Sequence, residues 1–201
     1  MIHEFKQGKE GAPTFVLLHG TGGTEHDLMP LAKALDQDAS ILTFRGDVIE
    51  DGMARFFRRL RPGVFDEEDL LIRTEAMIER IDKLSNDLSF DGDNVYAIGY
   101  SNGANLAASI LFKTSETFKG AMLLHPMVPL KGVKLPNLSS NEILITAGVN
   151  DPICPKDESE MLFKMFDEAR SNVTVEWFKE GHSIGASEVE ALKRWYANKK
   201  G

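Results

Sequence analysis

Short apolar segments alternate with amphipathic stretches along most of the chain, and this alternation restricts the fold more than any other feature. The segments are bounded by Gly, Asn, Asp or Pro, as strands buried on both faces should be. The predicted strands are Thr14–Leu18, Ser40–Phe44, Asn94–Ile98, Lys119–Leu124, Glu142–Ala147 and Val173–Phe178. Strands that alternate with helices indicate an α/β fold, with a mostly parallel twisted sheet covered by helices on both faces. Ligands of such a sheet bind beyond the carboxyl ends of its strands.

The stretches between the strands carry apolar side chains at helical spacing. The longest such stripe consists of residues three or four positions apart, namely Leu70, Thr74, Met77, Ile81, Leu84 and Leu88. Shorter stripes occupy residues 161–169 and 189–196. The chain has 201 residues and shows neither an internal repeat nor a linker. It is therefore predicted to be one domain, residues 1–201, without a separate lid domain.

Charge and cysteine content narrow the class of protein. The formal net charge of −8 disfavours a nucleic-acid partner, because nucleic-acid phosphates would be repelled. The first residues are polar, and no apolar run reaches the roughly 18 residues that a membrane span needs. The only cysteine, Cys154, cannot form an intramolecular disulfide, and a packing role is expected for it. We therefore expect a cytoplasmic protein that does not insert into membranes.

The sequence Gly99-Tyr100-Ser101-Asn102-Gly103 directly follows a predicted strand and precedes the helical run Ala104–Phe112. This is the Gly-x-Ser-x-Gly pattern in the strand–turn–helix context where hydrolases present a nucleophilic serine. Glycines flank such a turn because it leaves no room for side chains, and the tight turn lifts the serine hydroxyl clear of the sheet. Two glycines and a serine could also simply form a loop, but the context favours Ser101 as a nucleophile.

A serine hydroxyl needs a base within hydrogen-bond reach, and the base needs an orienting acid. His182 follows the last predicted strand, where this fold is expected to place its base. Asp151 follows the strand Glu142–Ala147 and is predicted to be the acid. The resulting chain order of Ser, Asp and His is typical of α/β-hydrolases.

Other residues compete for these two roles. Asp157 and Asp167 are alternative acids, but both fall within a predicted helix and should face solvent. Among the remaining histidines, His19 is expected to be structural, and His3 and His26 are expected to be exposed. His125 ends a strand and could approach the site.

A tetrahedral intermediate also needs backbone N–H donors for its oxyanion. One donor is predicted to be Asn102, which follows the nucleophile, and the other to be Thr21 in the glycine-rich stretch His19–Gly23. That stretch could instead bind phosphate, but it lacks the Lys-Ser/Thr of a P-loop and does not match a dinucleotide fingerprint. No residues show metal-ligand spacing, so neither a cofactor nor a metal is predicted.

The segment Arg45–Glu68 is too long for a simple connection. Its aromatic residues, together with one methionine further along the chain, are predicted to line an acyl or aryl pocket: Phe56, Phe57, Phe65 and Met127. One of its arginines could anchor a polar ester. In the alternative interpretation, the phenylalanines belong to the core and the arginines pair with the acidic residues that follow them.

Several motifs together resemble the phospholipase/carboxylesterase family, which includes acyl-protein thioesterases: Leu17–Gly23, Gly99–Gly103, the Asp151 turn and Gly181-His182. Three further stretches are similar to a bacterial branch of that family linked to hydroquinone and catechol stress: Arg45–Val48, Arg55–Arg59 and Gly63–Asp69. The resemblance implies a compact α/β-hydrolase fold without a lid, metal-free chemistry and the residue roles given above. It also implies an arginine at position 125, where this chain has histidine.

These features predict a serine carboxylesterase that hydrolyses small, short-acyl or aryl esters through an acyl-serine intermediate. An acyl thioesterase or lysophospholipase-like hydrolase would use the same residues and differ in its leaving group. A catalytically silent ligand-binding module is disfavoured, since such a protein has no reason to retain all three catalytic groups. The expected partner is a small-molecule ester, and a homodimer is one option for the assembly.

Overall fold

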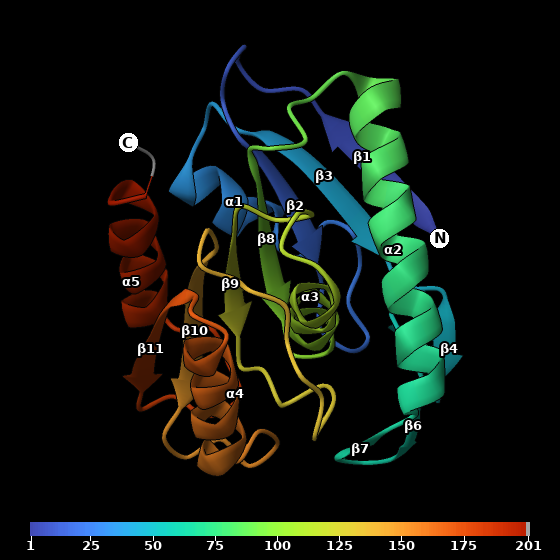
Figure 1. The fold of residues 1–201 in the computed structure, drawn as a ribbon, viewed down its shortest axis with the longest axis vertical. Coiled ribbons are helices and arrows are strands. Elements are labelled where there is room, and N and C mark those ends of the chain that lie inside the picture. The colour runs from blue at the N-terminus through green and yellow to red at the C-terminus, as the bar shows by residue number, and fades with distance from the viewer. Residues whose placement is uncertain (200–201) are drawn as a thin grey trace.

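A seven-stranded sheet with the order β1-β3-β2-β8-β9-β10-β11 forms the centre of the computed structural model, which describes residues 1–199 (Figure 1). Six strands run parallel: β2 (Thr14–Leu18), β3 (Ser40–Arg45), β8 (Val95–Tyr100), β9 (Gly120–Leu124), β10 (Glu142–Gly148) and β11 (Asn172–Phe178). Strand β1 (Ile2–Lys6) pairs with β3 in the antiparallel direction. The predicted mostly parallel α/β sheet is therefore confirmed.

The six parallel strands lie within two residues of their predicted bounds, whereas β1 was not predicted. Its residues alternate between exposed and half-buried positions at the edge of the sheet. Such a short edge strand lacks the continuous apolar run by which the buried strands were recognised. His3 consequently lies within the sheet, opposite Phe44 of β3, and is half-buried where an exposed residue was expected.

Helices cover both faces of the sheet. Helices α2 (Glu67–Leu88), α3 (Asn102–Lys113) and α4 (Lys156–Glu168) pack on one face, and α1 (Met29–Leu35) and α5 (Ala186–Ala197) pack on the other (Figure 1). Successive side chains of a strand point to opposite faces. Val16 and Leu18 of β2 accordingly join the first core, while Phe15 and Leu17 join the second. Within residues 1–199, each helix is too short or too polar to cross a membrane.

The segment between β3 and α2 forms two short hairpins. Strands β4 (Val48–Glu50) and β5 (Met53–Arg55) make the first, and β6 (Arg59–Arg61) and β7 (Val64–Phe65) make the second. Helix α2 then begins after Asp66, whose carboxylate accepts a hydrogen bond from the Asp69 N–H. The hairpins start at the carboxyl end of β3, which places them at the edge where the loops after the other parallel strands also gather.

Candidate active site

Ser101 lies in the sharp turn between β8, the middle strand of the sheet, and α3. Its φ of +51° and ψ of −111° are unfavourable for a residue with a side chain. Two hydrogen bonds hold this conformation, from the Ser101 N–H to the Leu124 carbonyl and from the Asn105 N–H to the Ser101 carbonyl. Gly103 allows the helix to approach β2, because a Cβ there would lie 2.0 Å from the Leu18 carbonyl oxygen. The turn therefore presents the Ser101 hydroxyl beyond the sheet.

The structure brings Ser101, Asp151 and His182 together from the ends of three strands. The Ser101 Oγ lies 2.9 Å from Nε2 of His182, and Nδ1 of the same ring lies 2.7 Å from Oδ2 of Asp151. An ionised Asp151 can only accept, so Nδ1 carries the imidazole proton and Nε2 is free to accept from the hydroxyl. This is the geometry of a nucleophile, a base and an orienting acid.

Asp151 is held as a carboxylate by the loop that follows β10. Burial alone would raise the pKa of its carboxyl, but the donors around it outweigh this effect and lower the pKa. Its Oδ1 accepts from the backbone N–H groups of Ile153, at 2.8 Å, and Cys154, at 2.9 Å. Its Oδ2 accepts from His182 and from His125. All four bonds favour the ionised form, which is the form that orients a base.

Tyr100 supports His182 from β8. Its hydroxyl donates to the His182 carbonyl oxygen at 2.6 Å, and the two rings lie 5.4 Å apart. Burial, with smaller contributions from the charges of Asp151 and Glu188, raises the pKa of Tyr100 to about 12. The hydroxyl therefore remains a donor at neutral pH. This contact fixes the loop after β11 against the turn that contains Ser101.

Thr21 and Asn102 border the same pocket as Ser101. Within residues 1–199, neither backbone N–H donates to another group of the protein. The first hairpin holds both residues in place. Arg55 Nη1 donates to Thr21 Oγ1 at 2.6 Å, and the Phe56 N–H donates to Asn102 Oδ1 at 2.7 Å. The two residues predicted to bind an oxyanion are thus fixed by contacts that the sequence did not indicate.

A pocket of about 600 Å³ opens over Ser101 and His182. Its walls come largely from the hairpin segment and from the loops after β9 and β10, and they include Met53, Arg55, Arg59, Phe65, Met127 and Ile153. The predicted lining residues Met127 and Phe65 are thus in place.

The prediction that Phe56 and Phe57 line the pocket is wrong. Both are fully buried in the core between the sheet and α2. Phe56 packs against His19 with the ring centres 4.7 Å apart, and Phe57 packs against Phe65 at 5.2 Å. The alternative interpretation, that these phenylalanines belong to the core, holds for this pair, and Phe65 of the second hairpin supplies the aromatic wall.

The arginines of the segment divide between two roles. Arg58 pairs with Asp66 and Asp69, as the alternative interpretation expected. Arg55 is buried, and besides Thr21 it contacts the Phe57 carbonyl at 3.3 Å. Burial lowers the pKa of Arg55, and the charge of Arg59 lowers it further. The buried guanidinium thus joins the loop that contains Thr21 to the Phe57 carbonyl, and it also pairs with Glu50 at 3.6 Å.

The remaining acids and histidines mostly lie where the sequence suggested. Asp157 and Asp167 are exposed on α4, and His26 is exposed. His19 is buried, its Nδ1–H donates to the Gly20 carbonyl, and its Nε2 accepts from the Gly46 N–H at 3.0 Å. Burial lowers the pKa of His19, so this ring is a neutral structural histidine.

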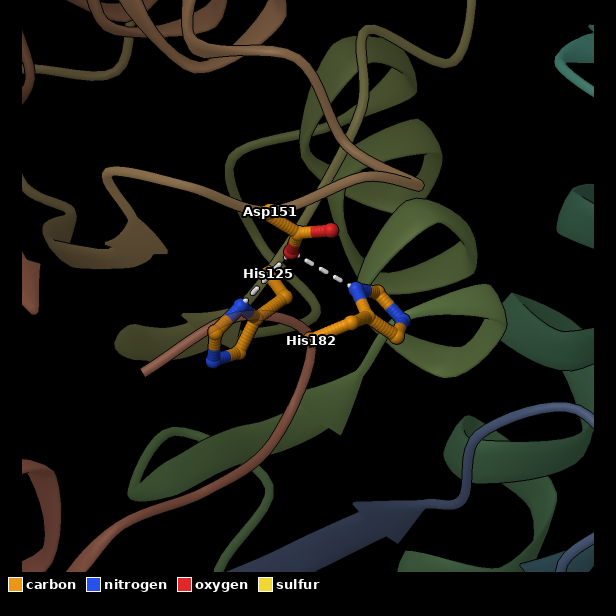
Figure 2. A group of neighbouring side chains, drawn as sticks. All are labelled: His125, Asp151 and His182. Atoms are coloured by element: carbon orange, nitrogen blue, oxygen red, sulfur yellow. Dashed lines mark hydrogen bonds and ion pairs between the residues drawn. The ribbon is translucent and has the colours of Figure 1, made fainter. Parts of the chain in front are cut away.

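Two residues at the site were not assigned from the sequence. His125, at the end of β9, lies 3.0 Å from Oδ2 of Asp151, the same oxygen that His182 contacts (Figure 2). Glu188, on α5, contacts the far nitrogen of His125 at 3.3 Å. The available signal was the buried stripe of α5, in which Glu188 precedes Ala191, Leu192 and Trp195 at helical spacing. A carboxylate in such a stripe needs a buried partner.

His125, Asp151 and His182 lie close enough to contact one metal ion. Both imidazoles, however, direct Nδ1 at the same Asp151 oxygen (Figure 2), and that carboxylate already accepts four hydrogen bonds. Hydrogen bonding accounts for the arrangement without a metal ligand set. In the part of the chain that the structure describes, Glu4, Glu25 and His26 form a second cluster of this kind, and none of them lines the pocket.

The strand order, the sharp turn after the middle strand and the adjoining pocket define an α/β-hydrolase of the carboxylesterase type. The chain belongs to the dienelactone hydrolase family, whose sequence model matches residues 58–199. It is 44% identical over 196 residues to MhqD of Bacillus subtilis (strain 168), a protein whose name assigns it to the hydrolases, and the match covers 98% of each chain.

Solved structures agree with this assignment. A Bacillus cereus carboxylesterase is 50% identical, with a TM-score of 0.96 over 99% of this chain and 94% of that one. A Mesorhizobium loti carboxylesterase is 28% identical, with a TM-score of 0.88 over 94% of this chain and 90% of that one. The chain is therefore a hydrolase of the dienelactone hydrolase and carboxylesterase type, and the resemblance to carboxylesterases noted in the sequence is confirmed.

Proposed function

We propose that this protein is a serine carboxylesterase that hydrolyses small, short-acyl or aryl esters through an acyl-serine intermediate. The observation that carries the proposal is the continuous hydrogen-bond chain from the Ser101 hydroxyl through His182 to Asp151, with contacts of 2.9 and 2.7 Å. The same pocket is bordered by the backbone N–H groups of Thr21 and Asn102, which donate to no other group within residues 1–199.

The residues support a two-step reaction. In the first step, Ser101 Oγ attacks the ester carbonyl carbon while His182 Nε2 takes the hydroxyl proton. The carbonyl oxygen becomes an oxyanion that accepts from the N–H groups of Thr21 and Asn102, and each such donor is worth about 2.7–4 kcal/mol in the transition state. His182 then gives its proton to the departing alcohol, which leaves an acyl-serine.

In the second step, water attacks the acyl-serine. His182 takes a proton from the water and returns it to Ser101 Oγ as the carboxylic acid is released. Asp151 keeps the His182 ring in one tautomer throughout and stabilises its positive charge. A direct test is to assay the purified protein with acetyl, butyryl and palmitoyl esters of p-nitrophenol and with the matching thioesters. Hydrolysis of the short esters supports the proposal, whereas activity on thioesters alone would identify a thioesterase.

The pocket walls lead to a prediction about chain length. Phe65 and Met127 line the pocket that contains Ser101. We expect kcat/KM for p-nitrophenyl acetate or butyrate to exceed that for the palmitate ester. Phe65→Ala should shift the preference towards longer chains, because it removes the aromatic wall.

Leu60→Ala is a matched control, since Leu60 is 71% exposed on the same hairpin and lies outside the pocket lining. It should leave the chain-length profile unchanged. A wild-type preference for palmitate, or a Phe65→Ala profile identical to that of the wild type, would show that this hairpin does not limit the acyl group.

A further inference from the structure

A second imidazole, that of His125, contacts the Asp151 carboxylate. His125 is fully buried at the end of β9, and its φ of +50° places it in the left-handed region, which few residues other than glycine adopt. Its N–H donates to the Thr146 carbonyl at 2.8 Å, and its own carbonyl accepts from the Cys154 thiol at 3.1 Å. A conformation that costs about 1–3 kcal/mol persists only where the surroundings impose it. These contacts fix the His125 ring in one place.

The ring lies between two carboxylates from different parts of the chain. Its Nδ1 is 3.0 Å from Asp151 Oδ2, and its Nε2 is 3.3 Å from Glu188 Oε2. Glu188 is fully buried, and its other oxygen accepts from the Thr146 hydroxyl at 2.5 Å. A neutral imidazole has one N–H, so it can donate to only one of the two carboxylates. For the ring to donate to both carboxylates, both of its nitrogens must carry hydrogen, which makes His125 an imidazolium.

The charges around the ring support the same state. Besides Asp151 and Glu188, the groups that face it are the edge-on Tyr100 ring at 5.9 Å, the His182 ring at 5.3 Å and the Cys154 thiol. Burial alone would lower the pKa of His125, but Glu188 and then Asp151 outweigh it and raise the pKa. Burial raises the pKa of the Cys154 thiol, which therefore stays neutral.

The additional proton on His125 also balances the net charge of the site during the reaction. With His125 protonated, the two carboxylates and this imidazolium sum to one negative charge. That charge matches the single positive charge that forms on His182 when it accepts the Ser101 proton. Without the His125 proton, two buried negative charges would face one another through a neutral ring, and one carboxylate would lose its donor.

We propose that His125, held as an imidazolium between Asp151 and Glu188, is a positioning residue that fixes the Asp151 carboxylate and through it the orientation of His182. The inference rests on the proposed serine-esterase function. His125 is not itself a catalytic residue, because it is fully buried, does not line the pocket and has both nitrogens occupied by carboxylates. Its effect reaches Ser101 only through Asp151.

A pH dependence follows from this role. The His125 pKa is raised, so the ring loses its proton only as the pH rises through that raised pKa. Asp151 then loses a donor, and kcat should fall on the alkaline side. Tyr100 has a pKa of about 12, so it keeps its proton at the pH values from about 6 to 10 that the test below covers.

The test measures kcat and KM from about pH 6 to pH 10 for the wild type and three variants. His125→Gln should lower kcat roughly 10- to 100-fold with little change in KM, as expected for loss of a charge-assisted hydrogen bond. Glu188→Gln removes the charge but keeps the shape, so His125 becomes neutral and can still donate to Asp151. The alkaline fall in kcat should then disappear, while the plateau drops less than in His125→Gln. Glu190→Gln, on the exposed side of α5, is the matched control and should keep the wild-type profile.

Nitrogen-15 NMR of histidine-labelled protein tests the proton without relying on activity. Both His125 nitrogens should carry hydrogen in the wild type at neutral pH, and only one should do so in Glu188→Gln. A single protonated nitrogen in the wild type would overturn the proposal, as would an alkaline limb unchanged by Glu188→Gln in an active enzyme. A wild type that hydrolyses no ester would instead refute the proposed function, and the two failures are thereby distinguished.

Discussion

Replacing His182 with alanine is expected to lower kcat for p-nitrophenyl acetate about a millionfold, nearly as much as replacing Ser101. The physical reason is that His182 Nε2 lies 2.9 Å from the Ser101 hydroxyl and is the base of the proposed reaction. His125 cannot take its place, since both of its nitrogens face carboxylates and the ring is fully buried. Steady-state kinetics of the purified variant, with circular dichroism to establish that it is folded, measure the effect.

Because the triad acts as a unit, the double variant with Ser101→Ala should lose no more activity than either single variant. His26→Ala is the matched control: this histidine is exposed and lies outside the pocket, so its removal should not change kcat. A His182→Ala protein that kept more than about a tenth of wild-type turnover would mean that another group accepts the serine proton.

Asp151→Asn is expected to lower kcat by up to about 10⁴-fold while leaving the fold intact. The amide oxygen can still accept from the N–H groups of Ile153 and Cys154, so the loop after β10 keeps its support. The amide nitrogen would then occupy the place of Oδ2, where it meets Nδ1 of His182 and Nδ1 of His125. A donor in that place favours the wrong tautomer of His182, and the base can no longer accept from Ser101.

The measurement is kcat together with the thermal unfolding midpoint, which should change far less than the activity. Asp157→Asn, on the exposed side of α4, serves as the control and should behave as the wild type. Near-normal turnover in Asp151→Asn would mean that the orienting acid is a different residue.

The parts of the site that the sequence could predict are those encoded locally. The Ser101 turn was recognisable because two glycines, a strand and a helix stand in immediate succession, and Gly103 shows why a larger residue would not fit. Asp151 lies in the loop after β10 and His182 in the loop after β11, and parallel strands bring their carboxyl ends to one edge of the sheet. Strand position and chain order were therefore enough to choose these residues.

The parts that could not be predicted depend on packing between distant segments. Phe56, Phe57 and Phe65 are alike in the sequence, and only the pairing of two short hairpins decides that Phe65 borders the pocket while the other two enter the core. Glu188 and His125 are separated by 63 positions and meet because α5 packs on the sheet beside the ends of β9 and β10. No short sequence motif marks either the placement of Phe65 or the contact between Glu188 and His125.

Covalent labelling of Ser101 tests the central claim most directly. The purified protein would be treated with a fluorophosphonate, which forms a phosphonyl ester with an activated serine and releases fluoride, and then analysed by intact-mass spectrometry and peptide mapping. We predict a single adduct on the peptide that contains Ser101, and none in Ser101→Ala. A wild-type protein that stays unlabelled, or a Ser101→Ala protein that is labelled as readily as the wild type, would contradict the assignment of Ser101 as the nucleophile.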